Sequence, residues 1–505
     1  MNLAAIVTRA AEQVGERAAI KLGDRVTTYR GLDEASARAA ALLRARGAVP
    51  GDRVVLALPN SPWFPAFYYG ALRMGAIAVP LNVLMREQEL VACLTHCEAR
   101  LLVAWHEALE HARAARASVD FDLIEVNPAT ADELLAAHPP ERALADVAPD
   151  ATAVLQYSSG TTGESHAAEL THANLDASSR LMLEALGSVD GEVVLSAAPF
   201  AHSYGQNVGM STILRGHGTL ALMTRFDAAE ALEVVDRERV SIAVGVPTMC
   251  ARMLELDPLP SRMPSLRLFL AAGGRMPVRL LHEFERAFGC EVLEGYGMSE
   301  APRIAVNRPG RRKPGSVGLP LRELEVRLLD ANGEPAPPGE AGELSVRGPN
   351  VMKRYWRRPA ATAEMMRDGW LHTGDLALID EDGYIHIVGR LKDTIVRGGY
   401  TIYAAEVERV MATHPRVAEV AVVRVPDAEM GEEVGAAVVL VRGGDPPDPE
   451  ELKGFVRERL APYKYPRVLW FAESLPRTAT GKVIKRAIAI PPELVRSGEG
   501  AGGTS

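Results

Sequence analysis

Helix-like segments alternate with short apolar runs along most of this chain, and the alternation constrains the fold more than any other feature. Up to about Pro320, helical periodicity such as that of 32–45 is interleaved with apolar runs at 54–58, 101–104 and 193–197. Such alternation is typical of sheets whose faces are covered by helices. We therefore expect an α/β fold with a large, multi-layer N-terminal domain.

The pattern changes at Glu323 and again after Gly389. Short strand-like runs at 325–329 and 343–346, separated by turn sequences, predict a β-rich subdomain. The segment after Gly389 has an α+β pattern. Its expected elements are helices at 403–413 and 449–460 and strands at 417–425 and 434–441.

These changes predict three parts of the chain. The first is a large N-terminal domain of residues 1–391, which includes the β-rich subdomain. The second is a small α+β C-terminal domain of residues 392–496, of ordinary domain size. Residues 497–505 are rich in Gly and Ser and are expected to form a disordered tail.

Composition indicates a globular enzyme. The 505 residues are 47% hydrophobic and 24% charged, and 56 Lys and Arg against 65 Asp and Glu give a net charge of −9. A chain this acidic is not a dedicated nucleic-acid binder, so no nucleic-acid partner is expected. Charged residues interrupt the apolar positions of 1–22, and no later apolar run is long enough to cross a bilayer. We therefore expect a cytoplasmic protein without a membrane span.

Four cysteines are too few and too scattered for a disulfide framework. Cys93, His96 and Cys97 lie on one helix-like segment, which raises the possibility of a metal site. A second pair of ligands is missing, and structural zinc sites need four ligands. We interpret this cluster as ordinary packing.

The most specific motif is the segment 157–163, of sequence YSSGTTG, which follows a strand-like run. Small residues let backbone N–H groups curl around an anion, and the hydroxyls of Ser159, Thr161 and Thr162 add donors. The loop could therefore hold phosphate oxygens. Taken alone, it could equally be a polar turn.

A second motif, 295–300, combines small, aromatic, hydroxyl and carboxylate residues after a strand-like run. Between Gly295 and Gly297, Tyr296 could stack on a base, while Ser299 could donate to a phosphate and Glu300 could hold Mg²⁺. A solvated strand end is the alternative.

Two further motifs lie nearer the C-terminus. Asp375 lies in a turn, where a carboxylate suits paired ribose hydroxyls, and Arg390 could reach a phosphate or ribose. The segment 476–482 presents Lys482 in a loop. That lysine is informative because lysine is absent between Lys21 and Lys313.

Together and in this order, the four motifs resemble those of the adenylate-forming acyl-CoA synthetase family, which includes firefly luciferase and the adenylation domains of peptide synthetases. The resemblance runs from about Thr28 to Arg486. It implies a large N-terminal domain for acyl and nucleotide binding and a small C-terminal domain that rotates between two half-reactions. In the first, a carboxylate attacks the α-phosphate of ATP, giving acyl-adenylate and pyrophosphate. In the second, the CoA thiol attacks the acyl carbon and releases AMP.

The resemblance also implies roles for particular residues. Asp375 would bind the ribose with Arg390 as its partner, Lys392 would be the hinge, and Glu300 would bind Mg²⁺. Lys482 would reach the α-phosphate and the substrate carboxylate during adenylation.

Other matches concern the adenine, the acyl group and CoA. Gly274 would approach the adenine and Ile387 would cover it, while Gly398 and Gly399 would line the pantetheine tunnel. His202, in the sequence Pro-Phe-Ala-His, would lie near the acyl carbonyl; taken alone, it could be a core histidine.

The phosphate loop departs from the family pattern. The family continues with Pro, Lys, Gly and Val after one variable residue, whereas Ser165, His166, Ala167 and Ala168 follow Glu164 here. The lysine for the outer phosphates is thus replaced by His166, beside the negative Glu164. Smaller departures are Arg354, where a glycine is usual, and Ala404, where a proline is usual.

Three hypotheses follow. The first is an acyl-CoA ligase homologue that forms thioester from acyl-adenylate and CoA, with adenylation weak or absent and a separate enzyme supplying the acyl-AMP. In this it is similar to the non-adenylating ligases of platensimycin-type biosynthesis. The second is a complete ATP-dependent synthetase, in which case ATP and Mg²⁺ are used. The third is a catalytically silent ligand-binding partner of an active ligase, which the retained Gly398, Gly399 and Lys482 disfavour.

Small residues occur where the family lines its acyl pocket, so we expect a bulky, apolar acid. Alternatively, glycines there serve close approach of backbone to nucleotide. Arg303 could bind a second carboxylate or point into solvent. The small residues are Ala271, Ala272, Gly273, Gly274, Gly295, Gly297 and Ala301.

Overall fold

The chain forms two compact units in the computed structural model, which describes residues 2–157, 166–259, 263–398, 400–427, 429–441, 443, 446–478 and 483–494. The first unit comprises Met1–Glu325 and Val346–Leu371, and the second comprises Val326–Ser345 and His372–Ser505. This division by packing differs from the boundary at 391/392 expected from sequence. The proposed hinge at Lys392 concerns motion, and it stays a prediction.

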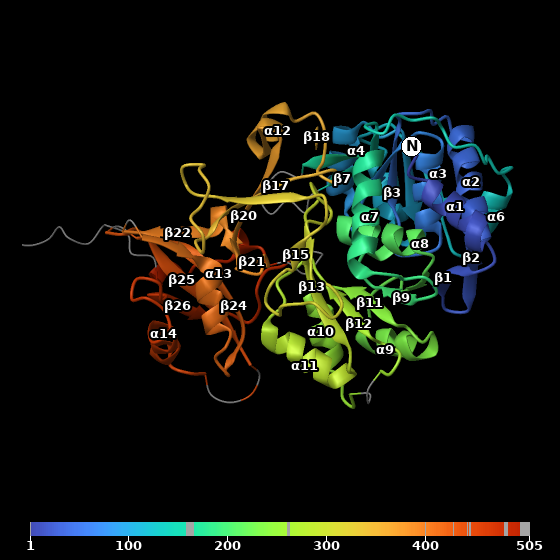
Figure 1. Ribbon diagram of the computed structural model, residues 1–505. Coiled ribbons are helices and arrows are strands. Elements are labelled where there is room, and N and C mark those ends of the chain that lie inside the picture. The colour runs from blue at the N-terminus through green and yellow to red at the C-terminus, as the bar shows by residue number, and fades with distance from the viewer. Residues whose placement is uncertain are drawn as a thin grey trace, which may run out of the picture. The chain divides into compact units, whose positions relative to one another are not determined.

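The first unit contains a seven-stranded sheet (Figure 1). Its central strands are parallel, and an antiparallel pair flanks the phosphate loop, with Tyr157 opposite Ala167. The sheet order is β18 (Arg354–Tyr355), β8 (Ala167–Thr171), β7 (Thr152–Tyr157), β4 (Ile77–Pro80), β3 (Arg53–Ala57), β5 (Leu101–Trp105) and β6 (Asp122–Val126).

A nine-stranded sheet completes the layers of the first unit, with parallel pairing from β10 through β13. The carboxyl ends of β9, β12 and β13 therefore meet at one edge, which is where ligands bind in such sheets. The sheet order is β15 (Leu319–Pro320), β14 (Ala305–Val306), β13 (Glu291–Tyr296), β12 (Leu268–Ala271), β11 (Ile242–Gly245), β9 (Val193–Ser196), β10 (Thr219–Leu222), β1 (Ala18–Leu22) and β2 (Arg25–Thr28).

Helices cover these sheets, as the alternating pattern predicted. In Figure 1, α10 and α11 lie against the β11–β13 part of the larger sheet, where Phe284 and Phe288 of α11 pack with Phe269. The helices are α1 (Ala5–Val14), α2 (Tyr29–Ala45), α3 (Trp63–Arg73), α4 (Glu87–Cys97), α5 (Leu109–Ala115), α6 (Ala131–Ala136), α7 (His172–Leu186), α8 (Ile213–Arg215), α9 (Ala228–Arg237), α10 (Pro247–Leu254), α11 (Val278–Phe288) and α12 (Pro359–Met365).

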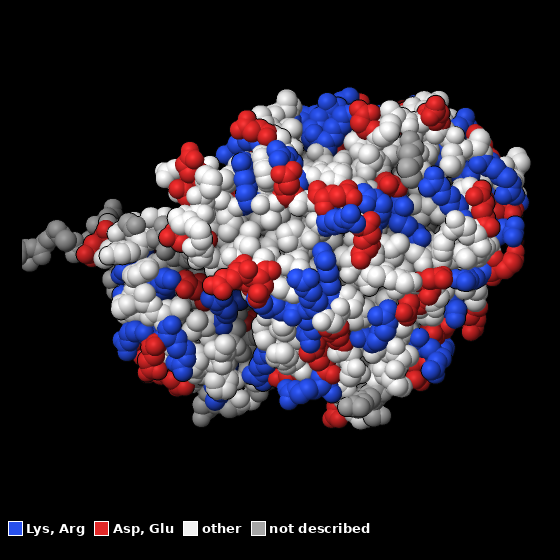
Figure 2. All heavy atoms as spheres, viewed as in Figure 1, with Lys and Arg blue, Asp and Glu red and all other residues white. Residues whose placement is uncertain are grey.

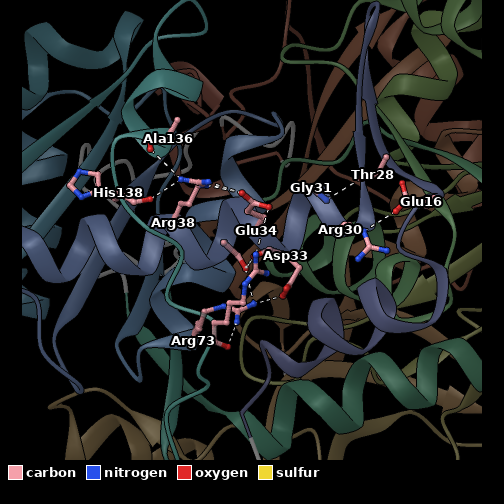
Figure 3. A network of polar contacts seen from close by, with 12 residues as sticks. Glu16, Thr28, Arg30, Gly31, Asp33, Glu34, Arg38, Arg73, Ala136 and His138 are labelled. Carbon is pink, nitrogen blue, oxygen red and sulfur yellow. Dashed lines mark hydrogen bonds and ion pairs between the residues drawn. The ribbon is translucent and has the colours of Figure 1, made fainter.

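A buried polar network joins α2 to α3 (Figure 3). The guanidinium of Arg73, which is 1% exposed, pairs with Asp33 and also donates to Ser36 Oγ and Thr8 Oγ1, each at 3.1 Å. One turn along α2, Arg38 pairs with Glu34 at 2.7 Å. The buried cation of Arg73 is thus neutralised by the carboxylate of Asp33.

The cysteine cluster on α4 is a packing feature. Cys93 and Cys97 are buried in an apolar core with Leu94 and Leu102, and His96 Nδ1 lies 2.9 Å from the Tyr157 hydroxyl. Over the described ranges, no group of three or more His, Cys, Asp and Glu side chains is placed to hold a metal ion.

The second unit is β-rich and then α+β, in the expected order, although the sequence analysis assigned the β-rich part to the large N-terminal domain. One sheet contains β16 (Glu325–Leu329), β17 (Gly342–Arg347) and β20 (Trp370–Ile379), with β21 (Ile385–Arg390) paired to β20. The short β19 (Met366–Arg367), which also pairs with β20, falls in the stretch Val346–Leu371 of the first unit. The other contains β23 (Tyr400–Tyr403), β22 (Thr394–Arg397), β25 (Gly431–Leu440) and β24 (Val417–Asp427), with β26 (Val468–Phe471) on β25. Helices α13 (Ala404–Met411) and α14 (Pro449–Arg457) pack on this second sheet through Val407, Met411, Leu452 and Val456.

The helices of the described residues show no feature typical of a membrane-spanning segment, and the face seen in Figure 2 does not carry charges of a single sign. None of the helices built from described residues has the length and apolar character needed to span a membrane. Acidic and basic side chains are interspersed over the face seen in Figure 2.

Candidate active site

The segment that carries His202 follows β9, and two buried polar side chains position it. Asn60 accepts from the Phe200 backbone N–H at 2.8 Å and donates to the carbonyls of Ser196 and Ala198 at 3.0 and 2.9 Å. Gln156, at the end of β7, donates to the Ala201 carbonyl at 3.0 Å. Both are buried, at 5% and 2% exposure.

His202 itself is half-buried, which differs from the alternative of a core histidine. Its Nδ1 accepts from the Tyr204 backbone N–H at 3.2 Å, which orients the ring. A π-helix, Gly205–Thr212, follows directly, and such turns occur frequently at functional sites. The side chain is thus held at the carboxyl edge of the larger sheet.

The motif 295–300 forms a tight reversal after β13. Met298 and Ala301 exchange backbone hydrogen bonds at 2.9 and 3.2 Å, and the Ile304 N–H donates to the Tyr296 carbonyl at 2.9 Å. A Cβ on Gly297 would lie 2.5 Å from the Pro302 carbonyl oxygen, so only glycine fits there. Tyr296 is partly exposed at the strand end, whereas Ser299 and Glu300 are 7% and 6% exposed.

Glu300 is not a solvated strand end. Its Oε1 accepts from the Tyr355 hydroxyl at 2.5 Å, and its carbonyl accepts from the Met352 N–H at 2.7 Å. Tyr355 comes from β18, about fifty residues along the chain, and no local signal in the sequence marked it as a site residue.

The flanks of the phosphate loop are described, although Ser159, Thr161 and Thr162 lie outside the described residues. β7 and β8 pair on either side of the loop. After it, the His166 ring packs on the Tyr355 ring with centroids 5.0 Å apart. His166, Tyr355 and Glu300 therefore form one continuous set of contacts.

Arg354, the departure from the usual glycine, has a structural explanation. β18 pairs with β8 so that Arg354 lies opposite Glu169, and Arg354 Nε donates to Glu169 Oε1 at 2.7 Å. The Glu169 side chain is 1% exposed, while that of Arg354 is 55% exposed. Thr152 also donates to Glu169, at 2.9 Å. Arg354 thus neutralises a buried carboxylate.

We predict that Arg354→Gly lowers the free energy of unfolding by about 2 to 4 kcal/mol, because it leaves the Glu169 carboxylate buried without its cation. The double variant Arg354→Gly with Glu169→Gln should recover most of this loss. Urea denaturation of the single and double variants measures both effects. Equal stability of Arg354→Gly and the unmodified chain would contradict the assignment.

In the second unit, Asp375 and Arg390 come together as the motifs predicted. They are cross-strand neighbours on β20 and β21, and Arg390 Nε donates to Asp375 Oδ1 at 3.0 Å. Asp375 is 6% exposed, and its backbone N–H donates to Thr373 Oγ1 at 3.1 Å. Ile387 is partly exposed on β21, two positions past Ile385.

Lys392 lies in a short 3₁₀ turn, Leu391–Asp393, that joins β21 to β22. Its carbonyl accepts from the Arg424 guanidinium. Gly398 has φ +53°, its N–H donates to the Met430 carbonyl at 3.0 Å, and a Cβ there would lie 2.9 Å from Met430 Sδ. The positive φ therefore favours glycine at 398, whereas the flexible Met430 side chain could move to admit a Cβ.

Four further residues from the sequence analysis are Gly274, Ala404, Gly399 and Lys482. Gly274 is exposed just beyond β12, after Gly273 with φ +79°. Ala404 is the first residue of α13, where proline is also well tolerated, so this departure keeps the helix start. Gly399 and Lys482 lie outside the described residues.

Glu294 is a titratable group next to the motif that the sequence did not single out. It is 6% exposed in β13, and its Oε2 accepts from the Gly315 N–H at 2.8 Å. Burial raises the pKa of Glu294 to about 7, although the Gly315 N–H and the cations of Arg312 and Arg275 oppose the shift.

This raised pKa predicts a pH-dependent stability. Between about pH 4.5 and 7 the unfolded carboxyl has lost its proton while the folded one retains it, so the contribution of Glu294 falls as pH rises, by about 3 kcal/mol in all. Glu294→Gln should remove this component. The measurement is the difference in unfolding free energy between the unmodified chain and the variant at pH 4.5 and at pH 7.5. A difference that is the same at both pH values would contradict the shift.

Comparisons with known proteins agree with this arrangement. The family model "AMP-binding enzyme" matches residues 7–356, and "AMP-binding enzyme C-terminal domain" matches residues 406–482. The feruloyl-CoA synthase of an Amycolatopsis species is 40% identical, with 92% of this chain and 94% of that protein covered. The long-chain-fatty-acid–CoA ligase of Bacillus subtilis is 33% identical, with coverage of 96% and 94%.

A solved structure is similar over nearly the whole length. The crystal structure of ATP-bound MatB from Rhodopseudomonas palustris superposes with a TM-score of 0.91 at 32% identity, covering 96% of this chain and 98% of that one. The fold, the motif order and these similarities agree. The chain is an acid–thiol ligase of the AMP-binding enzyme family, whose members here include CoA ligases and synthetases.

Proposed function

We propose that this ligase forms an acyl-CoA thioester from an acyl-adenylate and CoA, and that its ATP-dependent adenylation is weak or absent. The observation that carries the proposal is the phosphate loop. Ser165, His166, Ala167 and Ala168 stand where the family has Pro, Lys, Gly and Val. Loss of one charged contact to a phosphate costs on the order of 1.5 to 3 kcal/mol, or roughly 10- to 100-fold in binding.

The contacts of His166 support this reading. An imidazole is shorter than a lysine side chain, and this one packs on the Tyr355 ring at the edge of β8. Tyr355 in turn donates to Glu300, the proposed Mg²⁺ ligand. His166 thus packs against Tyr355, which binds Glu300. In the family, the lysine at this position would instead bind the outer phosphates of ATP.

The retained residues fit an acyl-adenylate, which lacks those phosphates. In the proposal Asp375 holds the ribose, Arg390 orients Asp375, Ser299 donates to the phosphate, and Tyr296 stacks on the base. Gly274 and Ile387 contact the adenine, His202 lies by the acyl carbonyl, and Lys482 contacts the carboxylate side of the adenylate. The CoA thiol, guided by Gly398 and Gly399, attacks the acyl carbon, the bond to AMP breaks, and AMP leaves.

Mg²⁺ belongs to the adenylation step if that step survives. Its sites commonly use one or two carboxylates together with substrate phosphates, and the buried Glu300 carboxylate fits that requirement as a single ligand. Glu300 would then exchange its contact with the Tyr355 hydroxyl for the ion.

A complete ATP-dependent synthetase is the second candidate. Lys482 stands at the motif position used in adenylation, in a chain otherwise poor in lysine. The similar proteins carry names of complete CoA ligases and synthases, and one similar structure holds ATP. A silent binding partner is the third candidate, disfavoured by the intact Gly398 and Gly399.

Two assays separate these candidates. Synthetic feruloyl-AMP and palmitoyl-AMP, chosen after the acids in the names of the relatives, are supplied with CoA, and thioester is measured. The corresponding free acids are then supplied with ATP, Mg²⁺ and CoA. We expect thioester from acyl-AMP and little from ATP. Equal rates in the two assays favour the complete synthetase. A chain that binds acyl-AMP without making thioester favours the silent partner.

We also propose that residues 392–496 move as a unit about Lys392 and that a separate enzyme supplies the acyl-adenylate. The small residues Ala271, Ala272, Gly273 and Gly274 at the carboxyl end of β12 support a bulky acyl group, because a Cβ added to Gly274 would meet no atom closer than 3.7 Å. The glycines of the 295–300 motif do not add to this space, since Arg303 lies against Gly295 and the Pro302 carbonyl lies against Gly297.

A further inference from the structure

Arg303 is among the most deeply buried large side chains in the chain, at 2% exposure. It follows the motif 295–300 and folds back against it. A Cβ added to Gly295 would lie 2.4 Å from Arg303 Nη1, so the guanidinium occupies the space that a side chain at 295 would fill. The alternative in which this arginine points into solvent is therefore wrong.

The guanidinium lies between the two segments assigned to the acyl-adenylate. It is 4.9 Å from the centre of the Tyr204 ring, and Tyr204 is two residues after His202. The Tyr204 hydroxyl donates to the Leu270 carbonyl at 2.6 Å, at the end of β12. Arg303 thus lies at the shared edge formed by the ends of β9, β12 and β13, with the candidate acyl carbonyl contact on one side and the nucleotide motif on the other.

Within the described part of the chain, this cation has no anionic partner. No described carboxylate forms an ion pair with it. Its Nε has no hydrogen-bond partner there, which is also true of Arg73 Nε, so the missing carboxylate is the feature that sets Arg303 apart. Tyr204 is the residue that favours the charged form, while burial lowers the pKa of the guanidinium. Tyr204 is itself neutral, because burial raises the pKa of its hydroxyl.

The contrast with Arg73 is informative. Both arginines are fully buried, yet Arg73 pairs with Asp33 (Figure 3). Arg73 also donates to Ser36, Thr8 and the Arg142 carbonyl. Buried charges are normally paired, because an uncompensated ion in a low-dielectric interior is strongly unfavourable. Arg303 therefore has the character of a cation whose partner is a ligand.

We propose that Arg303 binds a second carboxylate on the acyl group, so that the acid activated at this site is a dicarboxylate bound through one end and reacted at the other. A guanidinium suits this role because its planar donors match a carboxylate in a bidentate arrangement. The inference rests on the proposed function in one respect: it takes the segments at His202 and at 295–300 to hold the acyl-adenylate. It refines the expectation of an apolar acid to a bulky acid with one anionic end.

Binding of stable adenylate analogues tests the proposal without ATP or CoA. The probes are acyl-sulfamoyl-adenosines in matched pairs: glutaryl with pentanoyl, adipoyl with hexanoyl, and 4-carboxybenzoyl with 4-methylbenzoyl. We expect the unmodified chain to bind at least one diacid probe about 10- to 100-fold more tightly than its monoacid partner, the range for a charge-assisted hydrogen bond. Arg303→Met should abolish that preference, and Arg303→Lys should retain part of it.

Two controls identify the source of any effect. Arg322→Met, which removes an exposed arginine of the same unit, should leave the preference unchanged. Binding of AMP alone shows whether Arg303 contacts the nucleotide. If Arg303→Met lowers the affinity for AMP as much as the affinity for the diacid probes, Arg303 binds the nucleotide and the proposal is overturned. Monoacid binding equal to diacid binding in the unmodified chain across all three pairs also overturns it, and this arm needs no variant to fold. Because probe binding is independent of ATP, failure here leaves the account of the phosphate loop intact.

Discussion

Gly399→Trp is expected to abolish thioester formation while leaving binding of an acyl-adenylate nearly unchanged. The family resemblance places Gly399 on the path of the CoA thiol, and an indole there would block the approach to the acyl carbon. Its described neighbour Gly398 has φ +53°, and a Cβ there would lie 2.9 Å from Met430 Sδ. A displacement of about 1 Å at a reacting centre can lower the reaction rate on the order of 100-fold, and a side chain that blocks the thiol lowers it further.

The matched control is Val396→Trp. Val396 is 51% exposed on the same hairpin, so an indole there adds equal bulk without entering the glycine loop. Single-turnover thioester formation from preloaded feruloyl-AMP is the measurement. If Gly399→Trp consumes CoA at the normal rate, the tunnel has been placed wrongly.

Lys392→Pro is expected to lower multiple-turnover thioester formation on the order of 100-fold, with acyl-adenylate binding retained. Lys392 lies in the short 3₁₀ turn between β21 and β22, where the proposed rotation of residues 392–496 would change the backbone dihedral angles. Proline fixes φ near −65° and restricts the residue before it. The Lys392 carbonyl, which accepts from Arg424, remains present in the variant.

Lys392→Ala separates the backbone from the side chain. It removes the ammonium but leaves φ free, so the rotation account expects turnover close to that of the unmodified chain. Normal turnover of Lys392→Pro, or an equal loss in both variants, would contradict a hinge at this residue.

Much of the fold was predictable because the decisive patterns are local. The apolar run at 193–197 became β9, and the periodic segment at 32–45 lies within α2, which begins earlier because the side chain of Thr28 caps it by accepting from the Gly31 N–H at 3.0 Å. The expected strand at 434–441 is shorter than β25, since pairing with β24 extends it back to Gly431.

The candidate site was predictable where motifs carry it. Asp375 and Arg390 lie fifteen residues apart in sequence, and the β20–β21 pairing brings them together. Residues contributed by distant elements could not be found in this way. Asn60 bonds to the His202 segment from 140 residues earlier in the chain, and Gln156 from 45 residues earlier. No local sequence pattern around either residue marks it as part of the site.

The departures from the family show the same limit. Arg354 had no explanation in the sequence because its partner, Glu169, is a strand neighbour 185 residues away. Arg303 could equally have faced solvent, and its burial depends on how 295–304 folds back onto β13. The contact of His166 with Tyr355 likewise depends on the pairing of β18 with β8.

The central claim is that the altered phosphate loop has lost the outer phosphates of ATP while the adenylate site remains. The measurement that tests it is pyrophosphate exchange by the unmodified protein, using an acid whose acyl-AMP the same preparation converts to thioester. The quadruple variant Ser165→Pro, His166→Lys, Ala167→Gly and Ala168→Val is run beside it and should bind ATP more tightly, roughly 10- to 100-fold for a restored charged contact. We expect exchange near background in the unmodified protein. Robust exchange there would contradict the account and show that the altered loop belongs to a complete ATP-dependent synthetase.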